Sequence, residues 1–455
     1  MQRSIRKALT PLRVIVLAFT LLIVTGTLLL NLPVASRSGI SAGWLTSLFT
    51  ATSASCVTGL VLVDTATHWS IFGQVVILLL IQTGGLGIVT LSVFFISLMG
   101  RKVKLKEMLM IQESLNHFSF GDILKVWKKV VGLMFVIELV GALMLSIRFI
   151  PEFGPRGIFV SIFHAVSAFC NAGFDILGTP ANPFASLTGY ISDPLVTLTI
   201  AFLIILGGLG YIIWQDLLNL RKEKRLSYHS RVMLIFTCLL LVTGTLLFLA
   251  VEQDNPATMA DLSLAGKLHS SFFQSVTSRT AGFNTIDQTN MNVLSKIITV
   301  FLMFIGGGSG STAGGVKVTT MSVLLFAIIS QIRGSCDNIA FKHRIPISII
   351  MKAMTIVILA FLLVMAMSIL IMYIEQRNAD PKPYVDVLFE TASAFGTVGL
   401  SAVKTSTLHP LSHLMLILGM FLGKVGPLSF FLTLTMKASR EPCPVILPEG
   451  KMVVG

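Results

Sequence analysis

Four stretches of this chain end in a glycine after the same kind of lead-in, and each lies between two long apolar runs. The glycines are 114, 109 and 117 residues apart, which indicates a large unit repeated four times. Four copies in one chain can surround a single axis, so the repeat limits the fold to a pseudosymmetric arrangement. The stretches run from Phe49 to Leu60, Phe163 to Phe174, Phe272 to Phe283 and Phe389 to Leu400.

The composition places these repeats in a membrane. Of the 455 residues, 54% are hydrophobic and 12% are charged, which is too apolar for a soluble protein of this length. Several runs exceed the ~18 apolar residues that cross a bilayer. The first run, 14–32, is longer than the apolar part of a signal peptide and precedes further spans, so we predict that it is not cleaved. The five cysteines have neither metal-site nor disulfide spacing, so we assign them no redox role.

We therefore predict an all-α integral membrane fold with eight transmembrane helices and one central pore. Each of four pseudosymmetric repeats is a span, a short pore helix, a glycine loop and a second span, and the second helix of the third repeat is broken. The repeats are 1–100, 101–220, 221–335 and 336–440, followed by a tail at 441–455. The predicted spans are 12–33, 72–99, 129–150, 194–219, 231–251, 292–331 with an interruption, 347–374 and 411–436.

The segments before the glycines are too short to cross a bilayer, but they have the length of re-entrant helices. A re-entrant loop must satisfy its backbone inside protein or a water-filled cavity, and a permeating cation can take the carbonyls that it leaves free. Glycine permits the turns that such a loop needs. Ordinary helix packing by small residues is the alternative. The pore helices are predicted at 43–53, 157–167, 265–277 and 385–393. The predicted ion-coordinating residues are Val57, Thr58, Gly59, Asn171, Ala172, Gly173, Thr280, Ala281, Gly282, Thr397, Val398 and Gly399.

The basic residues set the predicted orientation. Of the 34 lysines and arginines, 23 lie at the termini and in the 101–129, 221–231 and 333–352 loops, all on one side of the predicted membrane. The positive-inside rule puts both termini in the cytoplasm and the glycine loops outside. The net charge of +13 then reflects topology and lipid contact rather than nucleic-acid binding. Acids on the outer side would raise the local cation concentration, although ordinary solvated loop charges explain each of them equally well. These acids are Asp64, Asp175, Asp193, Asp254, Asp261, Asp287, Asp380 and Asp386.

A second glycine cluster recurs in the second span of each repeat, at 84–87, 207–210, 306–310 and 423–426. In the third repeat it extends to residue 317. A helix does not tolerate six glycines in ten residues at ~1 kcal/mol each relative to alanine, so we predict a break in the membrane. The polar loop there would cross the pore as a gate; a hinge or a packing site is the alternative. A dinucleotide fingerprint and a P-loop are both rejected on context and spacing. The predicted gate residues are Gly306, Gly307, Gly308, Ser309, Gly310, Ser311, Thr312, Gly314, Gly315, Lys317 and Lys424.

Charged residues inside predicted membrane segments are functional candidates. Arg279 lies three residues before Gly282, and we expect it to fix the third glycine loop by bonding carbonyls or an acid such as Glu390. Lys424 would slow cations on the pore axis unless the gate loop offsets its charge. For Glu138 we favour a hydrogen-bonded helix residue, and for His164 a structural donor over a proton relay.

The four glycine motifs, the gate stretch, Gly423 to Leu428 and the tail from Leu447 to Gly455 resemble the membrane subunit of Ktr potassium uptake systems, in the Trk/Ktr/HKT superfamily. The similarity runs over nearly the whole chain. It implies K⁺ as the transported ion, Na⁺ as a possible activator and no organic cofactor in this chain. It also implies a homodimer with one pore per subunit in the bacterial plasma membrane, and a cytosolic regulatory ring that binds ATP or ADP.

Within that superfamily, glycine at all four filter positions accompanies K⁺ preference, and this chain has all four. The resemblance also assigns the gate to 306–317 and the pore-facing basic residue to Lys424, where arginine is usual. Cys56 and Cys170 differ from the residues expected in the superfamily, so the resemblance does not assign the side chains around the filter. Two rivals differ in class: an alternating-access transporter, disfavoured because the repeats are parallel, and a membrane enzyme, for which no catalytic dyad or metal cluster is found.

Overall fold

The computed structural model describes residues 11–87, 123–334, 337–341, 343–378 and 381–426. The predicted tail at 441–455, much of the 101–129 loop and the far ends of the spans predicted at 72–99 and 411–436 lie outside the described residues. The side chains of 11–15, 123–128 and 221–223 are also not described. All statements below concern the described part of the chain.

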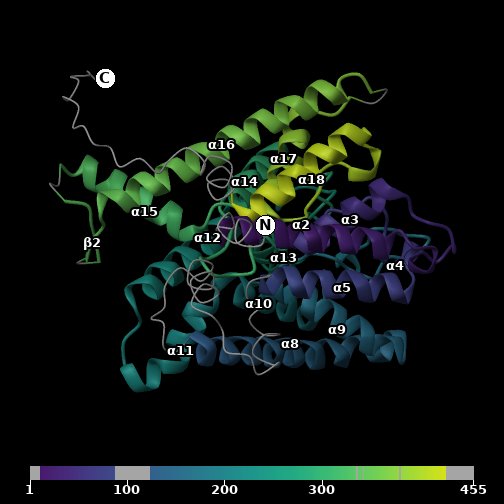
Figure 1. Ribbon diagram of the computed structural model, residues 1–455, viewed down its shortest axis with the longest axis horizontal. Coiled ribbons are helices and arrows are strands. Elements are labelled where there is room, and N and C mark those ends of the chain that lie inside the picture. Colours follow the sequence, from purple (N-terminus) through teal and green to yellow (C-terminus); the bar gives the residue numbers. More distant parts are fainter. Residues whose placement is uncertain (1–10, 88–122, 335–336, 342, 379–380, 427–455) are drawn as a thin grey trace, which may run out of the picture.

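Nearly all the regular secondary structure of the described chain is helical, which agrees with the predicted all-α class. A single short hairpin pairs β1 (Ile339–Ala340) antiparallel with β2 (His343–Arg344). Figure 1 shows the long helices α8 and α16 on opposite edges of the molecule. The longer helices are α2 (Pro11–Leu30), α5 (Ile71–Leu86), α8 (Ile123–Phe153), α10 (Pro194–Leu209), α11 (Tyr211–Glu223), α12 (Tyr228–Glu252), α14 (Val293–Phe304), α15 (Val318–Ile332), α16 (Ile347–Glu375) and α18 (Pro410–Val425).

Among the described residues, three helices are long and apolar enough to cross a membrane: 129–153, 228–252 and 347–375. The pair α10 and α11 passes the same test as one span bent by 97°. The other predicted spans correspond to shorter apolar helices, so the count of eight remains a prediction. Large apolar side chains such as Leu139, Leu246 and Phe361 are exposed on the long helices, as expected for surfaces that face lipid.

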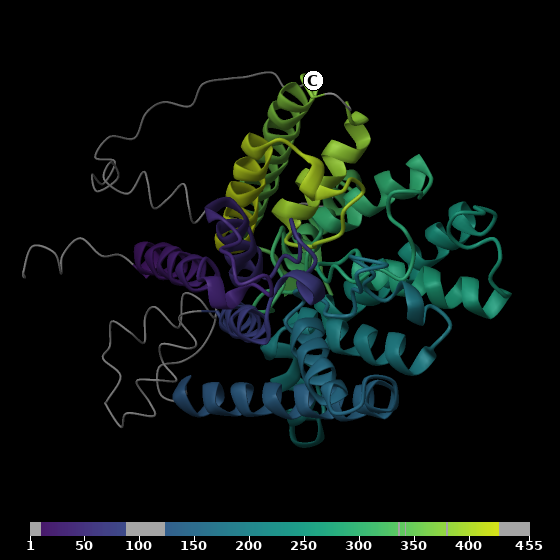
Figure 2. The ribbon, with the colours of Figure 1, turned by 90° about the vertical axis from the view of Figure 1, so that its right-hand side faces the viewer.

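Four short helices end just before the repeated glycines: α3 (Trp44–Cys56), α9 (Arg156–Phe169), α13 (Leu264–Thr277) and α17 (Tyr384–Gly396). Each packs against the helix that precedes it, and most of its last two turns is buried. Figure 2 shows the chain passing around the molecule in sequence order, from purple through blue and teal to green and yellow. This order brings the ends of the four short helices toward the middle of the fold.

One predicted span is not continuous. We predicted a single helix over 194–219, but α10 ends at Leu209 and α11 begins at Tyr211 in a new direction. Gly210 between them has φ +92°, a conformation that glycine adopts without the steric cost of a side chain. The glycines of this span therefore form a sharp corner, where the sequence analysis predicted an uninterrupted span.

Candidate functional site

The four repeated glycines form a closed ring of backbone contacts. A methyl carbon added to any of them would lie 2.1 to 2.6 Å from the carbonyl oxygen of the residue before the next glycine in the ring. The fourth glycine meets the first in the same way, which closes the ring. Protein carbons are essentially never found within about 3.0 Å of such an atom, so only glycine fits. The distances are 2.4 Å from Gly59 to Ala172, 2.6 Å from Gly173 to Ala281, 2.4 Å from Gly282 to Val398 and 2.1 Å from Gly399 to Thr58.

The loop backbone has the same unusual shape in all four repeats. The residue two before each glycine is left-handed, with φ of 59° at Val57, 59° at Asn171, 73° at Thr280 and 53° at Thr397. Three of these are β-branched residues, which rarely adopt positive φ. A strained conformation that recurs at four corresponding positions points to a functional requirement on the backbone.

Hydroxyl groups of the short helices hold the loops in place. Ser53 Oγ accepts the Gly59 N–H at 3.0 Å, and Ser393 Oγ accepts the Gly399 N–H at 3.0 Å. Ser167 Oγ instead donates to the Phe174 carbonyl at 2.7 Å. None of these three bonds uses a carbonyl that directly precedes a repeated glycine, so they fix the loops without occupying the carbonyls of the ring.

The second glycine cluster lies directly behind the ring. Methyl carbons at Gly84, Gly207 and Gly423 would lie 2.0, 1.8 and 1.8 Å from carbonyl oxygens near the ends of the short helices of their own repeats. The second helix of these repeats therefore touches the loop backbone, and glycine is required on packing grounds. The sequence predicted the cluster, but not that its glycines support the loops.

The stretch predicted as a gate forms no helix between α14 and α15. Its ends are joined to each other, because the Gly306 N–H donates to the Val316 carbonyl at 2.8 Å and the Val318 N–H donates to the Gly307 carbonyl at 3.0 Å. Its middle is bonded to other repeats. The Gly308 N–H donates to the Gly208 carbonyl at 2.8 Å. The stretch therefore closes on itself as a lobe that packs against the third and fourth loops.

The two predicted lysines both bind carbonyls of this lobe. Lys424 Nζ donates to the Thr312 carbonyl at 2.6 Å, and Lys317 Nζ donates to the Ala313 carbonyl. A methyl carbon at Gly314 would lie 2.2 Å from Thr397 Oγ1, so the lobe also touches the strained residue of the fourth loop. Both ammonium groups therefore face carbonyl oxygens of the lobe.

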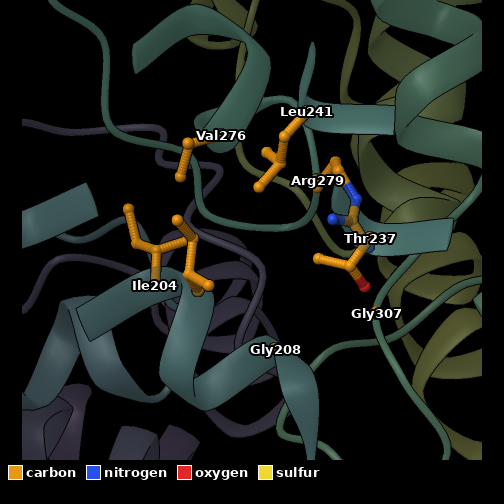
Figure 3. A pocket seen from close by; sticks show the side chains of 8 residues that line it. Ile204, Gly208, Thr237, Leu241, Val276, Arg279 and Gly307 are labelled. Atoms are coloured by element: carbon orange, nitrogen blue, oxygen red, sulfur yellow. The ribbon is translucent and has the colours of Figure 1, made fainter. Parts of the chain in front are cut away.

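Arg279 is buried with 7% exposure, and among the described residues it forms no ion pair with Glu390, which was one candidate partner. Within the described residues, Arg279 Nε has no hydrogen-bond partner. It lines a cavity with Thr237, Gly208 and Gly307, and Figure 3 shows its guanidinium beside Thr237. Thr237 Oγ1 is also buried without a partner, and the cavity has room for an ordered water molecule.

Glu390 has a different role from the one predicted. Its carboxylate accepts Ser401 Oγ at 2.8 Å and Thr405 Oγ1 at 2.5 Å. These bonds join the fourth short helix to the loop that follows Gly399. Glu390 was one candidate partner for Arg279, but hydroxyl groups near the fourth glycine satisfy its carboxylate instead.

The remaining polar residues that the sequence analysis singled out lie close to neighbouring polar groups. Gln82 Nε2 donates to both carboxylate oxygens of Glu138 at 3.1 Å, as expected for a hydrogen-bonded helix residue. His164 Nδ1 lies 2.8 Å from the Val160 carbonyl, in keeping with a structural role. Cys56 and Cys170 are buried and unpaired, and Cys170 Sγ lies 3.9 Å from Glu138 Oε1.

Several of the outer acids have partners in the structure. Asp64 accepts the Thr67 N–H at 2.7 Å and the Phe184 N–H at 2.8 Å. Asp193 caps α10 and pairs with Arg148 at 2.8 Å. Asp175 lies in the loop between α9 and α10, where burial and the nearby charge of Asp64 raise its pKa to about 7.

Two contacts between repeats were missed. Lys296 Nζ of α14 bonds Asp386 Oδ1 of α17 at 2.7 Å, and both side chains are mostly buried. With its amide oxygen facing Thr280 Oγ1 at 3.1 Å, Asn171 also donates to the Ile204 carbonyl at 3.2 Å. Asn171 was predicted only as a carbonyl ligand, and no local motif marks its partner 109 residues away.

Comparison with known proteins supports a transport role for this arrangement. Residues 4–441 match the family model of TrkH, described as a cation transport protein. The chain is 40% identical over 447 residues to Ktr system potassium uptake protein B of Bacillus subtilis, covering 98% of this chain and 97% of that protein. It is 38% identical to the potassium/sodium uptake protein NtpJ of Enterococcus hirae, covering 100% and 99%. Its fold matches the crystal structure of the potassium transporter TrkH from Vibrio parahaemolyticus with a TM-score of 0.70 at 17% identity, covering 94% and 84%.

Proposed function

Because this chain belongs to the TrkH family of cation transport proteins, we propose that it takes up K⁺ through a filter made of backbone carbonyls. The observation that carries the proposal is the closed ring of Gly59, Gly173, Gly282 and Gly399. In this proposal the carbonyls before these glycines face a common axis and replace the water that K⁺ loses on entry. The proposed ligands are the carbonyls of 57–59, 171–173, 280–282 and 397–399.

The strained residues support this assignment. A left-handed residue, with a glycine at positive φ two residues later, turns the carbonyls between them away from the usual helical direction. The C-terminal ends of the four short helices lie at the same place, and the negative end of a helix dipole favours a cation. Both features attract a cation to the ring without an acidic side chain.

The lobe at 306–317 is the proposed gate. It packs against the third and fourth loops, and Lys424 and Lys317 bond its carbonyls. Deletion of Gly308–Gly314 should therefore raise K⁺ flux, measured as rubidium uptake by proteoliposomes. An unchanged flux in a folded deletion variant would place the gate elsewhere.

Further parts of the proposal rest on the resemblance and on the names of relatives. We propose a homodimer in the bacterial plasma membrane, with eight spans and both termini in the cytoplasm. A cytosolic Ktr-type ring that binds ATP or ADP is the proposed regulator, since several relatives are named as components of a Ktr system. Na⁺ is proposed as an activator because one relative is named a potassium/sodium uptake protein.

The test is rescue of a bacterium that lacks its own K⁺ uptake systems. The chain should restore growth at low K⁺, and more strongly with the regulatory partner and with Na⁺. A Gly399→Ser variant, expressed and folded to the same level, should take up K⁺ with reduced preference over Na⁺. Failure of the unaltered chain to restore growth even with its partner would contradict the proposal.

A further inference from the structure

The proposed gate lobe is seated on the corner between α10 and α11. The Gly308 N–H donates to the Gly208 carbonyl at 2.8 Å, and the Tyr211 N–H donates to the Gly310 carbonyl at 3.3 Å. The Thr312 N–H also faces the Gly207 carbonyl at 3.5 Å. The first half of the lobe thus follows the backbone of the second repeat from Gly207 to Tyr211.

The two segments are packed backbone to backbone. A methyl carbon at Gly308 would lie 2.5 Å from the Leu209 carbonyl oxygen, and one at Gly210 would lie 2.8 Å from the Ser309 carbonyl oxygen. Glycine is therefore needed on both sides of the contact. This accounts for glycines in the second repeat that the filter alone does not explain.

The ring of Tyr211 covers the turn of the lobe. A methyl carbon at Gly310 would lie 2.5 Å from Tyr211 Cε1 and 2.9 Å from Cζ, and Tyr211 is 7% exposed. Tyr211 is the first residue of α11 and directly follows the 97° bend at Gly210. A change in the direction of α11 therefore moves this ring against the lobe.

Helix α11 extends from the corner to the basic 221–231 loop. Figure 1 shows it running toward the same end of the molecule as α15 and the hairpin. In the middle of α11, Asp216 accepts Ser230 Oγ at 2.5 Å, which ties α11 to the start of α12. One end of α11 thus meets the lobe, and the other leads to the side where a cytosolic partner would bind.

We propose that the segment Gly207–Tyr211 is the seat of the gate lobe and that Tyr211 is a positioning residue that holds the lobe closed. Displacement of α11 by the cytosolic partner would then move Tyr211 and release the lobe. This inference rests on the proposed function of the lobe as a gate.

The test is a flux measurement in two backgrounds, with rubidium uptake by proteoliposomes that lack the partner. Tyr211→Ala should raise flux several-fold in the intact chain and leave it unchanged in the chain lacking Gly308–Gly314. Tyr211→Phe keeps the ring and should keep flux low. Leu217→Ala, at an exposed position on the same helix, is the matched control and should have no effect.

The outcomes separate the two proposals. If the deletion alone leaves flux unchanged, the gate assignment fails. If the deletion raises flux but Tyr211→Ala does not, the gate assignment stands and the role of Tyr211 is overturned. The role of Tyr211 is also overturned if Tyr211→Ala raises flux equally in both backgrounds. Gly310→Ala keeps the Tyr211 side chain but adds a methyl group that pushes against its ring, so it should also raise flux. This second variant tests the same contact if the Tyr211→Ala protein does not fold.

Discussion

A methyl group at Gly399 is the sharpest perturbation of the proposed filter. In Gly399→Ala the added carbon would lie 2.1 Å from the Thr58 carbonyl oxygen and 2.9 Å from the Gly59 Cα, at a residue with φ +91°. Because such contacts are essentially never closer than about 3.0 Å, the fourth and first loops must move apart by about 1 Å. The left-handed backbone adds about 1–2 kcal/mol of strain for any residue with a Cβ.

The size of the effect follows from the ion. K⁺ is selected over Na⁺ by the number and spacing of its oxygen ligands, so an opening of about 1 Å on one side should remove most of that discrimination. If the difference in binding free energy between the two ions falls by about 1.4 kcal/mol, the preference for K⁺ falls tenfold. We therefore expect at least about a tenfold fall in K⁺/Na⁺ preference.

The assay is competition between K⁺ and Na⁺ for rubidium uptake by proteoliposomes. Gly39→Ala is the matched control, since Gly39 has φ +70° but no atom within 4 Å of an added carbon. It should carry the backbone strain and leave selectivity unchanged. If Gly399→Ala transports with unaltered K⁺/Na⁺ preference, the ring is not the filter.

Three further predictions concern charges. Lys424→Met removes the donor to the Thr312 carbonyl and should raise rubidium flux up to about tenfold. Lys424→Arg keeps a donor and should raise flux less. Equal flux in the unaltered protein and both variants would contradict a role of this bond in holding the lobe. Lys296→Met leaves the carboxylate of Asp386 buried without its partner and should lower the free energy of unfolding by about 3 kcal/mol or more. Adding Asp386→Leu should recover part of that loss. Both values are measured by denaturation in detergent. The raised pKa of Asp175 means that the folded protein holds a proton that the unfolded chain releases, so stability should fall as the pH rises from about 4 to about 7; a variant with Asn at 175 should show a flatter pH profile.

The sequence was most informative where the chemistry is local and repeated. The spacing of the glycines predicted the four loops, and the boundaries of the short helices agree with the structure to within a few residues. The glycines of 306–315 predicted the loss of helix between α14 and α15. Each of these features depends on backbone conformation, which glycine and helix length report directly.

Contacts between repeats could not be predicted in the same way. Nothing near Lys296 identifies Asp386, 90 residues away, as its partner. Glu390 was a candidate partner for Arg279 because the two have opposite charges, but Glu390 is satisfied by nearby hydroxyls. The corner at Gly210 was missed because a glycine cluster in an apolar run is equally consistent with a weakened helix. The corner packs against the lobe at 306–317, a partner that no local pattern predicts.

The central claim is that a dehydrated K⁺ binds inside the ring of four glycines. Anomalous diffraction from crystals of the protein grown with rubidium or thallium in place of potassium tests this directly. The account predicts density on the axis of the ring, within coordination distance of the carbonyls of Thr58, Ala172, Ala281 and Val398. A well-ordered ring that stays empty, with the heavy ion bound elsewhere, would contradict it.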